Sequence, residues 1–584
     1  MSTRAPTNAP RILAVVGGGV VLAGLYALAA QSRYPGGGDA PYHILTARSW
    51  FGGGGFIPGD PTQTKYPPAW SLALGAAGLF MGNSYAALAR FTAALFPVLL
   101  FATWLFVRRH SGVMRANWIT VAVALSPACF DAATRGARSE VLFTAASMAF
   151  LAWHARASTS DRRGASAFFA GVVLMVATVM LRTIGVALLL AVIATIVHVA
   201  IFERPRLRAL AATSTAPVLF AAAALFAWKL LSRSSAVERY PGERMNLYGS
   251  QFRLIDPHRP SLGVADNVDV LARIPGNLKS LIGHSAEMLT NIQWISPVWT
   301  SPVVMGLLVV LVAGVISELR RPAPLPAYYL LGYVGILTIW PFDEGQRFLV
   351  PIAPLLFLFA ASGMAFLSRV AHSRTSLVTR CVIGIAVAEL AALAVQIARD
   401  PVLSRQGVFA LFVWLVVLVI AIIGRRHLAA IWTMATRARL TRFAYRTEFI
   451  VLGFSGIYAL AVASWKADKG IGNGFQVASR WIAEHTGTDA VVMAQRHLDF
   501  ALTTGRRCVV FPVIGDPVRL VTALQRTGTR YLVVYDTPIE LAYYVPLERD
   551  RFSRIQNALN GALRLRVHDQ DVSVYELPPP DSLP

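Results

Sequence analysis

The chain has 584 residues, a formal net charge of +23 and a mean hydropathy of +0.53. Only 15% of its residues are charged and 55% are hydrophobic, whereas soluble domains carry about 25% charged residues. These values exclude an ordinary soluble protein and predict a chain that crosses a membrane several times. The surplus Lys and Arg lie mainly in short segments between apolar runs, the pattern of cytoplasmic loops and not of nucleic-acid binding.

Thirteen apolar runs are candidate membrane spans. The first follows a short polar N-terminus and has no small-residue cleavage site after it, which favours an uncleaved span over a signal peptide. An N-terminus in the cytoplasm places the arginine-rich connections inside and leaves residues 31–84, 233–300 and the chain after about 466 outside. The predicted spans are centred near residues 21, 96, 125, 147, 172, 192, 220, 310, 333, 358, 389, 415 and 457.

A shorter apolar run, Pro67–Gly82, lies in the first outer segment. With about 15 residues and two initial prolines it is too short for a full crossing. Counting it as a span would also place the basic segment RRHSGVMR outside. We therefore predict a re-entrant or interfacial segment on the outer face, where protein surrounds it.

The composition changes near residue 466. Four strand-like runs, AVVMAQ, RRCVVFP, RYLVVYD and RLRVHDQDVSVYELP, alternate with helical patterns in WIAEHTG and DPVRLVTALQRTG. Such alternation is typical of a small α/β unit. We predict an all-α polytopic membrane domain over residues 1–465 and an extracytoplasmic α/β domain over residues 466–584. Three cysteines are too few for a disulfide framework, so we expect them to be packing residues.

The first outer segment contains GGGDAPYHILTARSW, in which a single acidic residue, Asp39, follows three glycines. The next apolar residues recur at helical spacing and form a narrow stripe suited to a helix at the membrane surface; they are Ala40, Ile44, Ala47 and Phe51. Asp39 can cap this helix or serve the chemistry of a site, and the segment alone leaves both roles open.

Cations accompany this carboxylate on the predicted outer face. KYPPAW places Lys65 at the membrane surface. One interpretation is that its ammonium binds a lipid phosphate. The other is a snorkelling lysine, whose stem lies along apolar surface while the ammonium stays in water. The turn FDAATRGARSE holds Arg135, Arg138 and Glu140, and the turn WPFDEGQRFLVPIAP holds Arg347. Outer arginines run against the charge rule, so they either pair with neighbouring acids or hold an anionic ligand. Arg182, in MLRTIG, is a further outer cation.

These segments resemble the GT-C superfamily of integral membrane glycosyltransferases, in the branch that includes protein O-mannosyltransferases and the lipid A aminoarabinose transferase. The resemblance covers about the first 360 residues and depends on the order of several motifs between spans. The motifs are GGGDAPYHILTARSW, KYPPAW with GLFMGNSYAALARF, ARSEVLFTAASMAFLAW, LRTIGVALLL and GQRFLVPIAPLL. It implies a GT-C-like fold and transfer of a hexose or pentose from a polyprenyl-phosphate donor to a lipid, glycan or protein on the outer side of the bilayer.

The resemblance also implies roles for individual residues. Asp39 corresponds to the catalytic carboxylate, as base or orienting group for the acceptor hydroxyl, and Lys65 and Arg347 to ligands of the donor phosphate. Other residues of the same segments are expected to bind substrate: Tyr66, Arg135, Arg138 and Glu140. Many relatives have two adjacent acids where this chain has Asp39 alone, which weakens the case for a divalent metal in the first loop without closing the question. Some relatives also place the lysine directly before the prolines, whereas Tyr66 intervenes here.

Two other functions stay open. One is a transporter or flippase of lipid-linked sugars, against which the chain shows no half-to-half repeat of interrupted helices. The other is a non-catalytic subunit of an envelope-polymer assembly machine. We expect a bacterial cytoplasmic membrane, with the N-terminus in the cytoplasm and the α/β domain in the periplasm.

Overall fold

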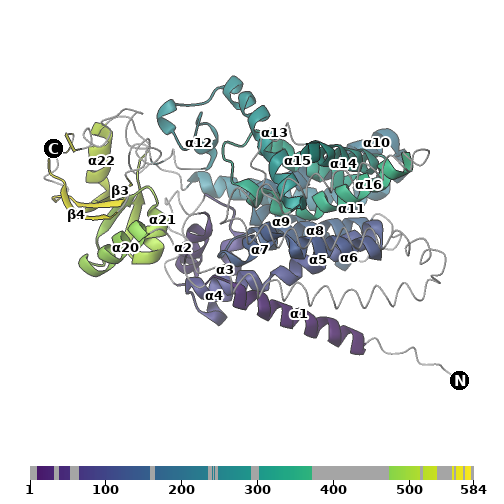
Figure 1. Cartoon of the computed structure of the whole chain (residues 1–584), viewed down its shortest axis with the longest axis horizontal. Helices are drawn as coiled ribbons and strands as arrows, with labels where there is room; N and C mark the ends of the chain where they lie inside the picture. The colour runs from purple at the N-terminus through teal and green to yellow at the C-terminus, as the bar shows by residue number, and fades with distance from the viewer. Residues whose placement is uncertain are drawn as a thin grey trace.

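The computed structural model describes residues 9–31, 34, 38–52, 65–157, 165–234, 240, 243, 248–290, 302–370, 473–512, 517–535, 556–557, 559, 561–569 and 572–579. A body of helices is joined at one end by a smaller unit built around a β-sheet (Figure 1). The predicted boundary at residue 465 and the predicted spans near 389, 415 and 457 lie outside the described residues.

The described helices of the body come from the first 370 residues. In chain order they are α1 (Ala9–Ala29), α2 (Ala40–Phe51), α3 (Ala69–Met81), α4 (Tyr85–Ala94), α5 (Phe96–Ser111), α6 (Val113–Leu125), α7 (Pro127–Thr134), α8 (Glu140–Ala157), α9 (Ala165–Leu181), α10 (Val186–Phe202), α11 (Arg204–Ser234), α12 (Tyr248–Phe252), α13 (Asn267–Thr290), α14 (Pro302–Leu319), α15 (Leu325–Thr338) and α16 (Ala353–Val370). The 3-10 helices among them are η2 (Thr183–Gly185), η4 (Pro260–Leu262) and η6 (Gly345–Ile352).

Helices cover the other ten predicted span centres, as expected from apolar runs that bury their backbone hydrogen bonds internally. Within the described residues, four helices are long and apolar enough to cross a membrane: Tyr85–Ser111, Thr183–Phe202, Leu210–Ser232 and Gly345–Leu367. Shorter apolar helices include Gly17–Ala29, Phe168–Leu181, Val304–Leu319 and Leu325–Thr338. The chain is therefore an integral membrane protein with a mostly helical body.

The predicted span near residue 125 coincides with two helices, α6 and α7, that are bent against each other. They meet at a bend of 61° around Ser126. Ser126 precedes Pro127 and has φ −70° and ψ 118°, the extended backbone that a residue before proline favours. The break makes α7 a separate short helix that leads into the turn before α8.

The first outer segment forms short helices, as predicted. Pro67–Gly82 gives the 13-residue helix α3, and Asp39 immediately precedes α2. The apolar stripe on α2 differs from the expectation of a helix lying on lipid. Ala40, Ile44 and Ala47 are at most 4% exposed, and the latter two belong to the core of the helical body. α2 therefore packs on protein, because α3 lies against it.

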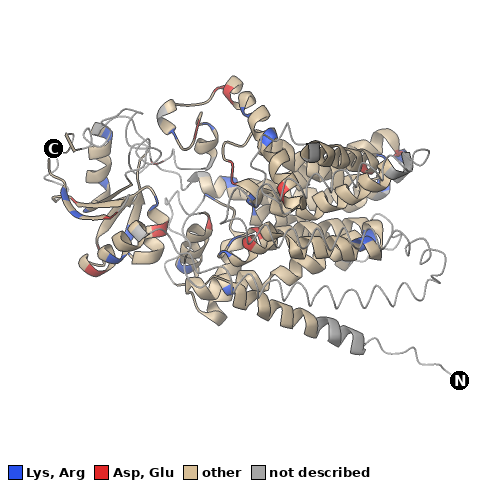
Figure 2. Ribbon diagram, viewed as in Figure 1, with Lys and Arg blue, Asp and Glu red and all other residues tan. Residues whose placement is uncertain are grey.

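Charged groups collect at both ends of α8, which has 18 residues and is therefore about 27 Å long. Glu140, at its start, lies among residues predicted to be outside. At its other end Arg109 donates to Ala152 O at 2.8 Å, and His110 pairs with Glu318 at 2.9 Å. The residues predicted inside and outside are thus separated by nearly the thickness of a hydrocarbon core, and the helices between them are largely uncharged (Figure 2).

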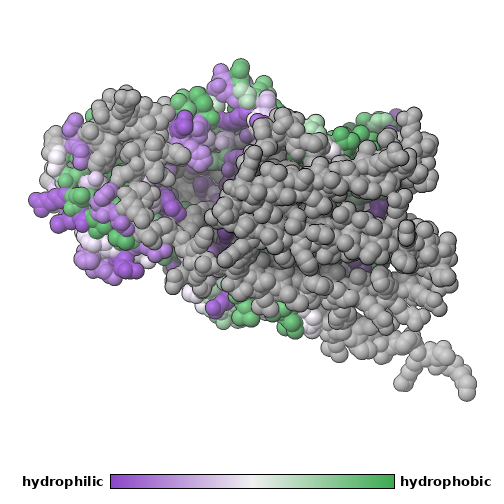
Figure 3. Space-filling view, viewed as in Figure 1, coloured by the Kyte–Doolittle hydropathy of each residue, from purple (hydrophilic) through white to green (hydrophobic). Residues whose placement is uncertain are grey.

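The smaller unit is an α/β fold, as predicted. Its elements are α20 (Asn473–His485), β1 (Val491–Ala494), α21 (His497–Thr504), β2 (Arg507–Val510), α22 (Pro517–Thr527), β3 (Tyr531–Tyr535), β4 (Arg564–Asp569) and β5 (Val572–Glu576). The strand order is β2-β1-β3-β5-β4, with the first three strands parallel and β5 antiparallel to both of its neighbours. Hydrophilic residues cover much of its visible surface (Figure 3). The sequence prediction missed α21.

Candidate active site

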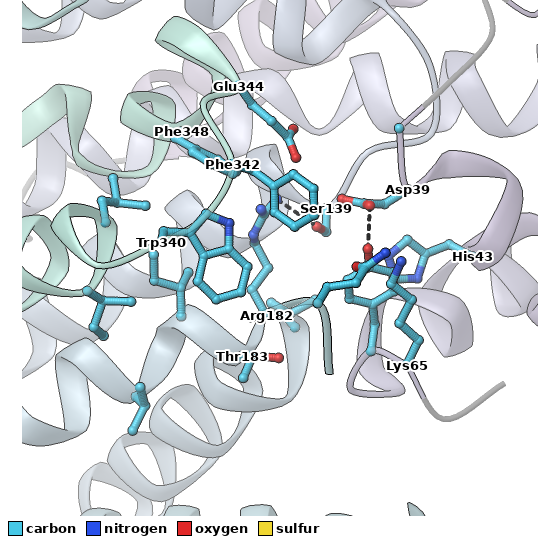
Figure 4. A pocket seen from close by; sticks show the side chains of 18 residues that line it. Asp39, His43, Lys65, Ser139, Arg182, Thr183, Trp340, Phe342, Glu344 and Phe348 are labelled. Atoms are coloured by element: carbon cyan, nitrogen blue, oxygen red, sulfur yellow. Dashed lines mark hydrogen bonds between the residues drawn. The ribbon is translucent and has the colours of Figure 1, made fainter. Parts of the chain in front are cut away.

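Asp39 lies at the N-terminal end of α2, but its side chain does not cap the helix. The residue occupies the N-cap position with helical dihedrals and makes no side-chain capping bond. Gly38 before it has φ +73°, a left-handed conformation that favours glycine. This turn leaves the Asp39 carboxylate free to point into a cavity, where Figure 4 shows it. The capping role that the sequence left open is therefore excluded.

Both oxygens of Asp39 accept strong hydrogen bonds. Tyr66 donates its hydroxyl to Oδ1 at 2.6 Å, and Arg347 donates from Nη2 to Oδ2 at 2.8 Å. Burial alone would raise the pKa of Asp39, but Arg347, Arg182 and the Tyr66 hydroxyl hold that pKa well below its usual range. The group is therefore an anion at any physiological pH.

Arg347 connects three carboxylates from different parts of the chain. Besides Asp39, its Nε donates to Glu140 Oε1 at 2.5 Å and its Nη1 pairs with Glu344. Their side-chain exposures are 20% for Asp39, 1% for Glu140 and 36% for Glu344. Glu344 is thus the partner that an incoming anion could replace most easily. Burial raises the pKa of Glu344, and Arg347 opposes that shift. Of the three carboxylates on Arg347, Glu344 is therefore the one most easily protonated.

Arg182 and Lys65 are the described cations that line the cavity itself. Arg182 is held by Glu140 at 2.8 Å and by Ser139 Oγ at 3.2 Å. Lys65 makes no hydrogen bond or ion pair with any residue that the structure describes, and its ammonium lies 5.3 Å from the centre of the Tyr66 ring. Burial lowers the pKa of Lys65, while Asp39 and Glu344 oppose that shift. Lys65 thus has room for a ligand.

His43 also lines the cavity, four residues after Asp39 on α2. It is 2% exposed, its Nδ1 lies 3.0 Å from Ser71 Oγ, and burial lowers its pKa to about 4. The imidazole is therefore neutral at pH 7. Its Nε2 has no hydrogen-bond partner among the described residues.

An aromatic wall faces this polar side. Trp340, Phe342 and Phe348 stand across the cavity from Asp39 and Lys65 (Figure 4). The cavity has a volume of about 270 Å³, close to the lower end of small-molecule pockets. The polar side and the aromatic side of the cavity together suit a ligand with an anionic head and an apolar portion.

The turn that carries Glu344 and Arg347 is supported by α13. His284 on this helix contacts Glu287 at 3.0 Å and Asp343 at 3.3 Å, and Ser280 donates to Asp343. The hydrogen bonds with Asp343 and Glu287 raise the pKa of His284 to about 9, so it is protonated at neutral pH.

The structure brings some predicted site residues together and separates others. Asp39, Lys65 and Tyr66 line one cavity. Arg347 and Glu140 lie behind its wall, joined to Asp39 through ion pairs. Two predicted substrate-binding residues do not line it: Arg135 pairs with Asp131 at 2.8 Å and is 45% exposed, and Arg138 makes no ion pair with a described residue.

The predicted set lacked several residues that line the cavity, among them Arg182 and His43. Arg182 was recognised only as an outer cation, and His43 was not singled out. Both had a signal in the sequence, since His43 follows Asp39 by one helical turn and Arg182 follows an apolar run predicted to end on the same side. Within the described residues, no group of three or more His, Cys, Asp or Glu has the geometry to hold a metal ion.

The fold is similar to that of solved structures of two membrane enzymes that have the GT-C fold. One similar solved structure is ArnT from Cupriavidus metallidurans bound to undecaprenyl phosphate, 14% identical over 97% of this chain and 98% of that one, with a TM-score of 0.54. Another is the oligosaccharyltransferase AglB from Archaeoglobus fulgidus in complex with an inhibitory peptide and a dolichol-phosphate, 11% identical over 97% of this chain and 74% of that one, with a TM-score of 0.52. No protein-family model and no curated protein matches the sequence. At these identities the likeness establishes the fold alone.

Proposed function

We propose that this protein is a glycosyltransferase that moves a sugar from a polyprenyl-phosphate donor to an acceptor on the outer face of a bacterial cytoplasmic membrane. One observation carries the proposal: Asp39, Lys65 and Arg182 line one cavity with an aromatic wall, and Arg347 pairs with Asp39 from behind the cavity lining. The lipid phosphates bound in both similar structures support the choice of donor.

The donor phosphate would enter beside Lys65 and Arg182. Lys65 has no ion-pair partner to give up among the described residues, so binding an anion there breaks no existing pair. Further in, the phosphate would replace Glu344 on Arg347, because Glu344 is the most exposed of the three carboxylates on that guanidinium. Arg347 would then bind the phosphate while remaining anchored by Glu140.

In the transfer step the acceptor oxygen attacks C1 of the sugar as the bond from C1 to the phosphate oxygen breaks. The electron pair of that bond leaves with the polyprenyl phosphate, whose growing charge Lys65 and Arg347 would stabilise. The acceptor proton passes to Asp39. An ionised carboxylate has about four lone-pair sites, so Asp39 can accept the acceptor hydroxyl beside its bonds from Tyr66 and Arg347. A single displacement of this kind inverts the anomeric centre.

The proposed orientation of the protein in the membrane follows from the charged groups at the two ends of α8. The arginine-rich end, with Arg109 and Arg321, faces the cytoplasm under the positive-inside rule. The cavity at the opposite end then opens on the periplasmic side, where the α/β domain of residues 466–584 also lies.

The test is turnover in proteoliposomes that contain the purified protein, a panel of polyprenyl-phosphate sugars and candidate acceptors. A glycosyltransferase releases free polyprenyl phosphate in proportion to the sugar that joins the acceptor. A flippase would instead move intact donor across the bilayer without cleaving it, and a non-catalytic subunit would do neither. Either of the latter results would refute the proposal.

A further inference from the structure

The helix that the sequence prediction missed, α21, is an element of the α/β unit that faces the segment of the candidate site. It is in contact with α2, the helix that begins directly after Asp39 (Figure 1). Leu502 on α21 packs against the apolar core of the helical body. α21 is therefore a point at which the α/β unit contacts the membrane-spanning body next to the site.

The same helix contacts the segment that precedes Asp39. Tyr34 donates its hydroxyl to Asp499, and its ring packs against the apolar cluster formed by α20, α21 and one face of the sheet. Asp499 is 7% exposed and is paired with Arg496 at 3.1 Å. Burial and the adjacent Asp499 carboxylate raise the pKa of Tyr34, so its hydroxyl stays a donor. α21 therefore contacts the Asp39 segment on both sides.

A second tyrosine anchors the other face of the sheet. Tyr240, from the second outer segment, is 1% exposed and donates to Val510 O at 2.8 Å. It belongs to the apolar cluster with Met493 and Leu532, whereas Tyr34 packs on the cluster with Val492 and Val533. Alternate residues of a strand point to opposite faces, so the two tyrosines dock on opposite faces.

We propose that the α/β unit is a positioning element for the candidate site, in which α21 fixes the Asp39 segment through Tyr34 before it and α2 after it. The inference deepens the proposed function and rests on it.

The sequence of the segment makes such a support necessary. Asp39 follows GGG, and glycine loses more conformational freedom on ordering than any other residue. A base must be held within a fraction of an ångström of its productive position, and an unsupported glycine-rich segment would sample many positions. Tyr34 and α2 limit that freedom, because both contact α21.

The test compares Tyr34→Phe with Tyr240→Phe in the full-length protein. Each variant removes one hydroxyl that docks the α/β unit, but only Tyr34 lies next to the Asp39 segment. We expect Tyr34→Phe to lower kcat about tenfold with donor affinity unchanged, and Tyr240→Phe to leave both near wild type. Leu502→Ala, which weakens the packing of α21 on the helical body and leaves both hydroxyls in place, should lower kcat in the same way as Tyr34→Phe.

A second readout does not depend on activity. The His43 amide donates to Asp39 O at 3.2 Å in the first turn of α2, so its hydrogen–deuterium exchange reports how firmly this turn is held. Exchange should accelerate in Tyr34→Phe and not in Tyr240→Phe. Equal changes in the two variants, an unchanged Tyr34→Phe, or faster exchange without loss of turnover would each overturn the inference. If the wild type transfers no sugar, the proposed function fails, and the exchange comparison alone decides whether α21 holds the segment.

Discussion

Two clusters of charged side chains lie at opposite ends of α8 and use the same residue types differently. At the N-terminal end, three carboxylates from separate elements converge on Arg347. At the other end, Arg321 pairs with Glu318 at 3.0 Å and donates to His110 O at 3.0 Å, and Arg109 donates to Ala152 O at 2.8 Å.

The difference shows that residue types alone do not distinguish a functional site from contacts that only stabilise the fold. Arg321 satisfies the His110 carbonyl, which lies in the last turn of α5 and has no partner within that helix. Arg109 donates to a carbonyl of α8, so both hydrogen bonds hold helices together. Arg347 binds three carboxylates. One of them, Asp39, lines a cavity that Lys65 also lines, and Lys65 has no ion pair among the described residues. The predictions below test this contrast.

Asp39→Asn should have the largest effect. It keeps the shape of the side chain but removes the charge that accepts the proton, so turnover should fall by about 10²–10⁴-fold, the usual contribution of a positioned base. The matched control is Asp131→Asn, which removes a predicted outer carboxylate that pairs with Arg135 and does not line the cavity. Turnover by the control should be near wild type. An Asp39→Asn protein with near-normal release of polyprenyl phosphate would remove Asp39 from the chemistry.

Arg347→Ala should weaken donor binding by roughly 10- to 100-fold, the worth of charge-assisted hydrogen bonds. It should also reduce the free energy of unfolding, because removing one member of a buried ion pair costs about 3–5 kcal/mol. Arg321→Ala, at the other end of α8, should reduce stability without changing donor affinity. Calorimetry with a polyprenyl phosphate, carried out below both melting temperatures, separates the two effects. Equal donor affinities in the two variants would show that the clusters do not differ in kind.

Lys65→Met should raise the Kd for the donor by roughly tenfold and leave stability unchanged. The methionine keeps most of the apolar length, and Lys65 has no ion pair to lose within the described residues. A clear fall in the melting temperature with unchanged donor affinity would assign Lys65 a structural role.

The smallest expected effect is a pH dependence from His284, which supports the turn before Arg347. Its folded-state pKa of about 9 exceeds the value of 6.5 expected for the unfolded chain. The proton therefore stabilises the fold fully below about pH 6.5, and its contribution is lost as the pH rises through about 9. Between pH 6 and pH 9.5 the melting temperature of wild type should fall more than that of His284→Gln. Parallel curves for the two proteins would contradict this role.

Much of the fold could be predicted because burial constrains composition. Apolar runs marked the helices of the body, and short β-branched runs marked the strands of the α/β unit. The misses have physical causes as well. α13 mixes polar and apolar residues and so gave no span signal, the bend at Ser126 depends on one proline, and α21 is only eight residues long.

The site was predictable in part. The motif order pointed to Asp39, Lys65 and Arg347, which the fold brings together through ion pairs and a shared cavity. Arg135 and Arg138 were chosen by their place in an outer turn, and sequence does not show which side chains of a turn face a cavity. Cys129 and Cys508 are buried and half-buried, consistent with packing; Cys381 lies outside the described residues.

The most direct test of the central claim is a cryo-electron microscopy structure of the protein with a polyprenyl phosphate. The account predicts the phosphate within hydrogen-bond distance of Lys65 and Arg347, with Glu344 displaced from the guanidinium and the first prenyl units along Trp340 and Phe342. A phosphate bound away from this cavity, with Arg347 still paired to Glu344, would contradict it.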